Sequence, residues 1–432
     1  MTGQRLHDLL HELGDTQPAV EVRPDVFRQG RRAHRRIVLL AGASLLAVIA
    51  IVGSLATSVL DQRTAPPAGG DLPPAIPTHV YAVPERLVSF TENGYTWGSD
   101  LGESDLAVGR ASVSLSFPGP VVISAEDGRY HLLDLPGYDW SSPRGTNAPT
   151  MALSPDGRRL AYSWYLDDDM MDDNHVPSGV RIVDLETGAV TSIRDDRGYG
   201  VVVEGLGWSP NGRYLVYSKA IRTSPNGTSG ARSFFVERLD TRTETSARID
   251  GIQFADHGLG VSDAGWVAAG NPATMVGADG VQLDLGLWGT SNASWSTNGE
   301  RIAFGSVQNG TVSIVGRTGR GSQRTVVGGG TVSVLGWTPD DRVGVLYLEG
   351  ESAQVELVSR PGVREEVVTM DREVRITTVS VATELLDQPT RDFAEPDWPF
   401  DPQSLVVPGL IVGVVVLALG AGYASERQRR RR

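Results

Sequence analysis

The densest group of chemically active side chains is an acidic run at residues 167–175. It contains five aspartates followed by an asparagine and a histidine: Asp167, Asp168, Asp169, Asp172, Asp173, Asn174 and His175. Carboxylate oxygens are the ligands that Ca²⁺ takes in proteins, but this spacing is not that of an EF-hand loop. Acidic insertions are usually solvated. The favoured interpretation is a solvated loop without a cofactor, and calcium held by the five aspartates is the alternative.

Other chemistry-bearing residues do not form a recognisable site. The histidines between the two apolar segments described below, His79, His131, His175 and His257, lack metal-ligand spacing, and there is no H-E-x-x-H motif. Neither a G-x-S-x-G nucleophile elbow nor a phosphate loop occurs. The chain has no cysteine and therefore no thiol nucleophile or disulfide. The sequence accordingly predicts no catalytic residue.

The elements that organise the chain are copies of one phrase. Three strong copies occupy residues 154–163, 208–218 and 295–304, and two weaker copies occupy 261–268 and 337–346. In each, an apolar strand ends in Ser or Thr, a tight turn follows, and an apolar strand resumes. The strong copies contain Asp-Gly or Asn-Gly, which supplies the positive φ angles that a two-residue hairpin turn needs. The phrase therefore predicts a β-hairpin.

The spacing of these hairpins predicts an all-β propeller. The Ser or Thr positions are 55, 53, 34 and 42 residues apart, which is the range in which four-stranded propeller blades repeat. Counting the strands that follow each phrase gives six blades between residues 80 and 387, although the first blade has no phrase. We expect the strand-like segments 80–83 and 374–382 to share a blade and so close the ring.

The phrase W-S-P-D/N-G resembles the repeats of TolB-type and WD-like β-propellers over residues 80–387. That resemblance implies the fold but not a function, because propellers include binding platforms and unrelated enzymes. The whole layout also resembles two-span membrane proteins of actinobacteria with an extracytoplasmic propeller. Such proteins occur beside extracytoplasmic-function sigma factors, so the resemblance implies a regulatory or accessory role.

Two uncharged apolar segments flank the propeller region. Residues 37–60 and 405–424 are each long enough to span a bilayer, so both are predicted to be transmembrane helices. A Pro/Gly-rich linker, 61–79, follows the first, and an acidic aromatic linker, 388–404, precedes the second. In that second linker Phe393, Trp398 and Phe400 are expected at the headgroup level.

Arginines next to both apolar segments predict the topology. The tail 1–36 and the terminal tail 425–432 are basic, so the positive-inside rule places both in the cytoplasm and the propeller outside, in a two-pass membrane protein. Subtracting their charges of +2 and +4 from the net −13 leaves −19 for the outer region. This acidity argues against a nucleic-acid partner.

The tail 1–36 begins with a stripe of leucines at helical spacing, Leu6, Leu9, Leu10 and Leu13. The favoured interpretation is a solvated leader, and the alternative is a short helix that docks a cytoplasmic regulator.

Two classes of function remain. In the first, the chain is a membrane-anchored binding or scaffold module that recognises an extracytoplasmic protein or ligand. Such a module would act as an accessory or regulator in envelope signalling. In the second, it is an anchored hydrolase or lyase whose carboxylates converge at the propeller channel from separate blades. The missing motifs favour the first. A convergent cluster of acids, arginine and histidine at one mouth of the ring would favour the second.

Overall fold

The computed structural model describes most of the region between residues 73 and 398. The described residues are 73–84, 88–91, 94–97, 106–116, 119–138, 151–165, 177–195, 200–221, 234–252, 258–270, 272–306, 310–319, 323–326, 330–349, 352–359, 363–371, 374, 379–396 and 398. The leucine stripe, both predicted membrane segments and the acidic run lie outside these residues. Among the helices that are described, none has the length and apolar character needed to cross a membrane.

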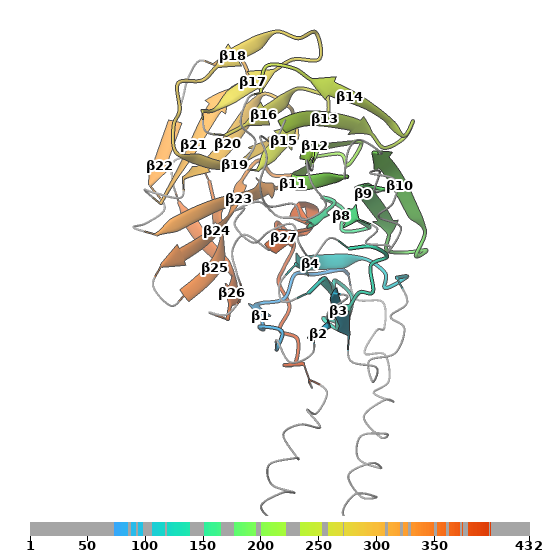
Figure 1. Cartoon of the computed structure of the whole chain (residues 1–432). Coiled ribbons are helices and arrows are strands. Elements are labelled where there is room, and N and C mark those ends of the chain that lie inside the picture. The colour runs from blue at the N-terminus through green and yellow to red at the C-terminus, as the bar shows by residue number, and fades with distance from the viewer. Residues whose placement is uncertain are drawn as a thin grey trace, which may run out of the picture. The chain divides into compact units, whose positions relative to one another are not determined.

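The described strands form six propeller blades and one small hairpin (Figure 1). Blade 1 contains β27 (Val379–Val381), β4 (Ala111–Leu115), β5 (Val121–Ser124) and β6 (Tyr130–Leu132); blade 2 contains β7 (Met151–Leu153), β8 (Arg159–Tyr165), β9 (Ser178–Asp184) and β10 (Val190–Asp195). Blade 3 contains β11 (Val201–Trp208), β12 (Tyr214–Ile221), β13 (Phe234–Asp240) and β14 (Thr245–Ile249); blade 4 contains β15 (Leu259–Val261), β16 (Val267–Ala269), β17 (Thr274–Val276) and β18 (Gln282–Asp284).

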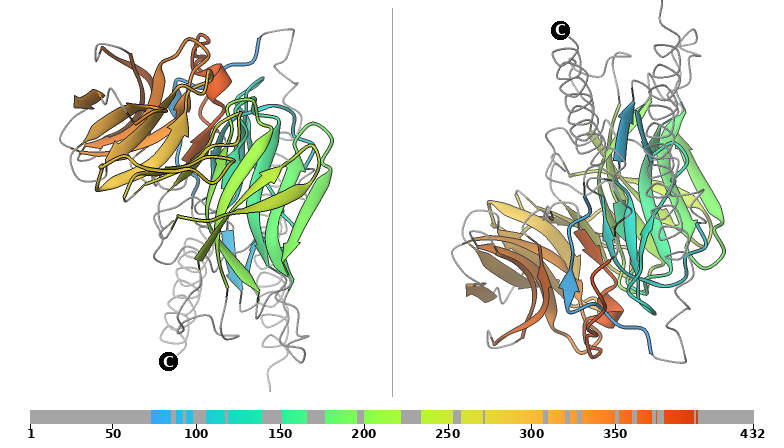
Figure 2. Two further views of the ribbon diagram at one scale, coloured as in Figure 1. Left: turned by 90° about the horizontal axis from the view of Figure 1, so that it is seen from above. Right: turned by 90° about the horizontal axis from the view of Figure 1, so that it is seen from below.

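Blade 5 contains β19 (Thr290–Trp295), β20 (Arg301–Ser306), β21 (Thr311–Gly316) and β22 (Gln323–Val326). Blade 6 contains β23 (Thr331–Trp337), β24 (Val343–Glu349), β25 (Ser352–Val358), β26 (Arg364–Met370) and the short β1 (His79–Val80). The separate hairpin pairs β2 (Val88–Thr91) with β3 (Gly94–Trp97), and a 3-10 helix, η6 (Thr383–Leu385), follows β27. The inner strands of consecutive blades contact each other, so the blades follow one another in chain order. Figure 2 shows the same sheets from two other sides. The predicted all-β, six-bladed propeller is therefore confirmed.

Strands from the two ends of the propeller region complete different blades. Strand β27 pairs antiparallel with β4 and so becomes the inner strand of blade 1. Strand β1 pairs in parallel with β26 at the outer edge of blade 6 (Figure 1). The expectation that segments 80–83 and 374–382 share a blade is wrong, because each end completes a different neighbouring sheet. This arrangement explains why blade 1 has no phrase: its first two strands come from opposite ends of the chain, and no hairpin joins them.

Hydrophobic cores lie between neighbouring blades. One core combines Leu346 of blade 6, Val381 of blade 1 and Tyr162 of blade 2, and further cores fill each of the other junctions. Each sheet contributes small and branched apolar side chains to the junction on either side of it. A single blade therefore cannot bury its own faces, and the six sheets are stable as a set.

The recurring phrase forms a longer turn than the sequence predicted. In blade 2 the amide of Gly157 donates to the carbonyl of Ser154 at 2.9 Å, and the Ser154 amide donates to the carbonyl of Arg159 at 2.8 Å. Only Gly157 has a positive φ, of 75°. Asp156 instead accepts the Ser154 hydroxyl at 2.5 Å and the Arg158 amide at 3.1 Å. The prediction of a two-residue turn is wrong because the aspartate holds a four-residue loop through its side chain.

The segments that lead to the two chain ends lie side by side. Pro77 and Arg391 form a parallel bridge, and the Arg391 guanidinium donates to the carbonyls of Glu126 at 3.0 Å and Pro73 at 2.7 Å. Ile76, within the expected linker, is completely buried. Packing on the propeller therefore extends to residues on both sides of the 80–387 region.

Two of the linker aromatics pack on the propeller. The Trp398 ring meets the Tyr130 ring edge-on with centroids 5.2 Å apart, and a Cβ added to Gly128 would overlap Phe393. Both side chains are half-buried. Their position at the headgroup level stays a prediction, and Phe400 lies outside the described residues.

Candidate functional site

Tryptophans of the phrase connect the inner strands of neighbouring blades. The indole N–H of Trp208 in blade 3 donates to the carbonyl of Ala152 in blade 2 at 3.0 Å. Trp337 in blade 6 donates to Ser294 in blade 5, also at 3.0 Å. In both cases the acceptor lies two residues before the phrase serine of the preceding blade. The tryptophan of the phrase thus fixes the spacing of adjacent inner strands.

Arginines of the phrase cover these tryptophans. The Arg159 guanidinium lies 4.9 Å from the Trp208 ring centroid and donates to the Gly212 carbonyl at 2.6 Å. Arg301 lies 4.7 Å from the Trp337 ring centroid and pairs with the Asp341 carboxylate. Cation–π contacts of this kind are worth about 0.5–1 kcal/mol at exposed sites and more when desolvated. Each arginine therefore clamps its own blade to the turn of the next one.

Blade 4, which carries a weak copy of the phrase, lacks this clamp. Trp266 occupies the position that Arg159 and Arg301 hold elsewhere, and it packs against the same core as Trp295 of blade 5. The Trp295 indole N–H is buried and has no hydrogen-bond partner in the described part of the chain. The junction of blades 4 and 5 is therefore held by apolar packing and by a backbone hydrogen bond of 3.3 Å from the Ala293 amide to the Gly258 carbonyl.

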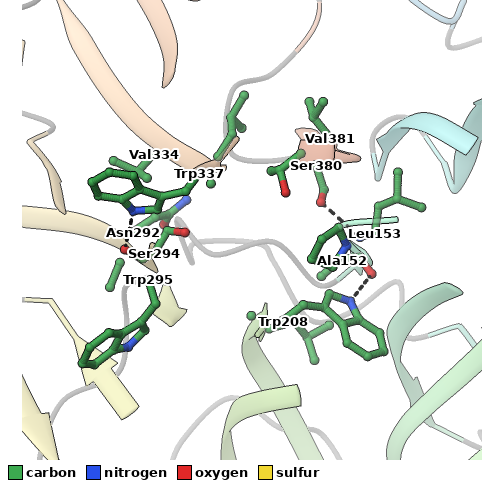
Figure 3. A pocket seen from close by; sticks show the side chains of 18 of the residues that line it. Ala152, Leu153, Trp208, Asn292, Ser294, Trp295, Val334, Trp337, Ser380 and Val381 are labelled. Atoms are coloured by element: carbon green, nitrogen blue, oxygen red, sulfur yellow. Dashed lines mark hydrogen bonds between the residues drawn. The ribbon is translucent and has the colours of Figure 1, made fainter. Parts of the chain in front are cut away.

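The inner strands enclose a central cavity of about 90 Å³ (Figure 3). All six blades line it with the following residues: Ala152, Leu153, Pro155, Leu206, Gly207, Trp208, Pro210, Gly258, Leu259, Asn292, Ala293, Ser294, Trp295, Val334, Leu335, Gly336, Trp337, Val379, Ser380, Val381 and Thr383. None of these lining residues is Asp, Glu, His, Lys or Arg. We call this cavity the channel.

Polar side chains of the channel link strands. The Asn292 amide donates to the Ser333 hydroxyl at 2.7 Å, and the Leu153 backbone amide donates to the Ser380 hydroxyl at 3.0 Å. The lining has one side-chain amide, that of Asn292, and three hydroxyls. These groups donate and accept hydrogen bonds, but they do not ionise near neutral pH. The described lining is thus suited to binding a neutral group and lacks a general acid or base.

Charged groups lie in the turns at one end of the channel. Pro155 and Pro210 line the channel and belong to these turns, and the lining residue Thr383 precedes Glu384. Burial, and then the neighbouring Asp156, raise the pKa of Glu384, which lies 3.5 Å from Arg110. This end of the channel therefore carries charges of both signs, as expected for a polar binding surface.

A second turn at this end contains a partly buried acid. Asp263 accepts the backbone amide of Asn211 at 2.9 Å, which connects the turns of blades 3 and 4. Burial raises the pKa of the Asp263 carboxyl. Its contact is structural, because the carboxylate caps the turn of the preceding blade.

The chain's single lysine is buried between blades 2 and 3. The Lys219 ammonium lies 2.7 Å from Asp195 and 2.6 Å from Glu237, and the Tyr217 hydroxyl donates to Glu237 at 2.9 Å. Sequence reasoning missed this network, because its members come from three strands and share no spacing.

The residues that the sequence singled out are not brought together here. The five aspartates of the acidic run and the leucine stripe lie outside the described residues, so calcium binding and tail docking stay predictions. Within the described residues no three His, Asp or Glu side chains gather as metal ligands. His79 instead pairs with Asp371 at 2.9 Å, and His131 lies apart in β6, where burial lowers its pKa.

The fold and the channel define a six-bladed β-propeller with an uncharged described lining. No protein family matches the sequence, and no relative was found among curated proteins. Solved structures are similar in fold. TolB from Acinetobacter baumannii is 16% identical over 65% of this chain and 67% of its own, with a TM-score of 0.39.

Two other propellers illustrate how varied the similar structures are. The Cps50 (Swd1) β-propeller domain of Myceliophteria thermophila is 16% identical over 53% of this chain and 73% of its own, with a TM-score of 0.35. An oligogalacturonate lyase in complex with manganese is 14% identical over 60% and 74%, with a TM-score of 0.36. At such identities the likeness concerns the fold alone.

Proposed function

We propose that this chain is a membrane-anchored binding or scaffold module whose extracytoplasmic propeller serves as an accessory or regulator in envelope signalling. The observation that carries the proposal is the channel lining, which comes from all six blades and contains no titratable side chain. A lining of indole, amide and hydroxyl groups favours recognition by hydrogen bonds and apolar contact. The described lining offers no acid or base for proton transfer, and so none that would activate its serine and threonine hydroxyls as nucleophiles.

The proposed double anchor is supported by the way the two ends leave the propeller. Residues 76–78 and Arg391 are hydrogen-bonded in parallel, with Thr78 N–H donating to Arg391 at 2.9 Å. Both linkers therefore leave from the same part of the molecule, and each leads to one of the apolar segments 37–60 and 405–424. A propeller held at one place by two spans has its remaining surface available to partners.

The role in signalling rests on the tail 1–36. Its stripe Leu6, Leu9, Leu10 and Leu13 would dock a cytoplasmic regulator, while the channel would bind an extracytoplasmic protein or ligand. Occupancy of the channel and of the tail would then be connected through one polypeptide.

The test is recovery of partners with the full-length protein, solubilised in mild detergent from its native membrane and quantified by mass spectrometry. Three variants are compared: one lacking residues 1–36, Ser294→Arg, which places a long cation in the neutral channel, and Val363→Arg as an exposed control at the blade 6 edge. We expect Ser294→Arg to lose the envelope partners and the truncation to lose only the cytoplasmic regulator. Recovery of the same proteins with all variants would contradict the proposal.

The catalytic alternative has its own outcome in this experiment. A hydrolase or lyase would turn over an extracytoplasmic substrate, and Ser294→Arg would abolish that turnover while Val363→Arg would not. Such activity would require acids or bases beyond the channel lining itself, such as Glu384 in the turns at its end.

A further inference from the structure

The outer edge of blade 4 presents an exposed apolar surface. Trp288, which follows β18, is 74% exposed, and Val281, which directly precedes β18, is 49% exposed. The leucines between them, Leu283, Leu285 and Leu287, are half-buried over the core that joins blades 4 and 5. An indole with this exposure is available to contact a partner.

The backbone at this edge has free pairing capacity. The carbonyl of Val281 and the amide of Leu285 are bonded inward, to Gly277 at 2.8 Å and Ala273 at 3.0 Å. Because bonding directions alternate along an antiparallel pair, the amide and carbonyl groups of Gln282 and Asp284 point away from β17. The strand therefore offers an outward hydrogen-bonding edge next to Trp288, which we call the β18 edge (residues 281–288).

The charges at the β18 edge favour a cationic partner. Asp279 and Asp284 are both exposed, and their hydrogen bonds to protein are to local backbone amides, those of Val281 at 3.2 Å and Gly286 at 2.9 Å. Two copies of this chain paired at the edge would bring these carboxylates together, which argues against self-association. A strand carrying arginine would instead neutralise them.

The propeller itself contains the contact that the β18 edge lacks. Elsewhere an arginine lies over an aromatic ring and pairs with a carboxylate, as Arg301 does with Trp337 and Asp341. Trp288 and Asp284 provide the ring and the carboxylate, yet no described arginine lies over Trp288. A guanidinium from a partner would complete the same arrangement at the β18 edge.

We propose that the β18 edge binds an extended, arginine-bearing segment of another protein by strand addition. The segment pairs with the backbone of Gln282 and Asp284, places arginines against Asp284 and Trp288, and packs an apolar residue near Val281. This surface is separate from the channel, so the proposal does not depend on the function proposed above.

The test uses a fluorescein-labelled octapeptide of alternating valine and arginine, titrated with the full-length protein and followed by fluorescence anisotropy. We expect Trp288→Ser to weaken binding by about threefold, as the loss of one cation–π contact implies, and Asp284→Lys to weaken it further. Val363→Ser, which removes an apolar side chain that is 64% exposed at the blade 6 edge, should leave binding unchanged.

A second peptide separates strand addition from plain charge attraction. It has the same sequence and net charge but carries N-methylated amides at its four central residues, so it lacks the N–H groups that pairing needs in either register. We expect it to bind much more weakly. Equal binding of both peptides, or equal binding by wild type and both edge variants, would overturn the proposal. So would concentration-dependent dimerisation that Trp288→Ser abolishes, because the occupant would then be a second copy.

Discussion

Replacing Trp337 by phenylalanine tests whether the indole hydrogen bonds hold neighbouring blades together. The change removes the 3.0 Å bond to Ser294 and leaves its part-buried carbonyl without this donor, at a cost of about 1 kcal/mol. It also weakens the stack with Arg301, because phenylalanine attracts a cation less than tryptophan, by about 0.5 kcal/mol. The loss of ring volume adds a packing cost.

Trp295 provides the matched control for this prediction. It is as buried as Trp337, but its indole N–H has no partner in the described residues, so Trp295→Phe costs ring volume while removing an unsatisfied donor. We expect Trp337→Phe to lower the free energy of unfolding by about 1–2 kcal/mol more than Trp295→Phe. Urea unfolding of the full-length protein, followed by far-UV circular dichroism, measures the difference. Equal losses would refute the role of the hydrogen bond.

Three further predictions concern single positions, each measured by the same unfolding assay. Gly157→Ala should destabilise the protein by about 1 kcal/mol more than Gly299→Ala does. Both glycines have a positive φ, but a Cβ at 157 would also overlap the Ala111 carbonyl. Equal losses of stability in the two variants would contradict this. Lys219→Met should lower the free energy of unfolding by about 3–5 kcal/mol, because it leaves the carboxylates of Asp195 and Glu237 buried without their cation. A loss below about 1 kcal/mol would contradict the burial of this network. Burial raises the pKa of Glu384 in the folded protein, so ionisation of its carboxyl opposes folding. The stability that the protonated carboxyl contributes is therefore lost as the pH rises from its unfolded pKa toward the folded one. Glu384→Gln should gain stability relative to wild type as the pH increases, and a relative gain on acidification would contradict this.

The repeated phrase made the fold predictable. Each copy combines an apolar strand, a buried Ser or Thr and a glycine turn, and these local signals recur at blade spacing. The phrase also contains Trp208 and Trp337, so the residues that join the blades were visible in the sequence. Their hydrogen bonds were not, because the acceptors are backbone carbonyls of the preceding blade.

Closure and the channel depend on contacts that no local pattern records. Whether β27 pairs with β4 or with another edge is decided by packing between residues more than 260 positions apart, so both end strands looked alike in the sequence. The channel lining takes only a few residues from each inner strand, and Asn292 and Ser380 have no shared spacing. The acidic run, by contrast, is visible as a local pattern, because its carboxylates are adjacent in the chain.

Strands from opposite ends of the propeller region, β27 and β4, close the ring and so form the channel. Val113 and Val381 face each other across β4 and β27 in a pair that is not mutually hydrogen-bonded, where side chains approach most closely. Because the chain has no cysteine, Val113→Cys with Val381→Cys introduces the only two thiols. On mild oxidation of the full-length folded protein, we expect an intramolecular disulfide and no free thiol. Two titratable thiols in the oxidised native protein would contradict the closure.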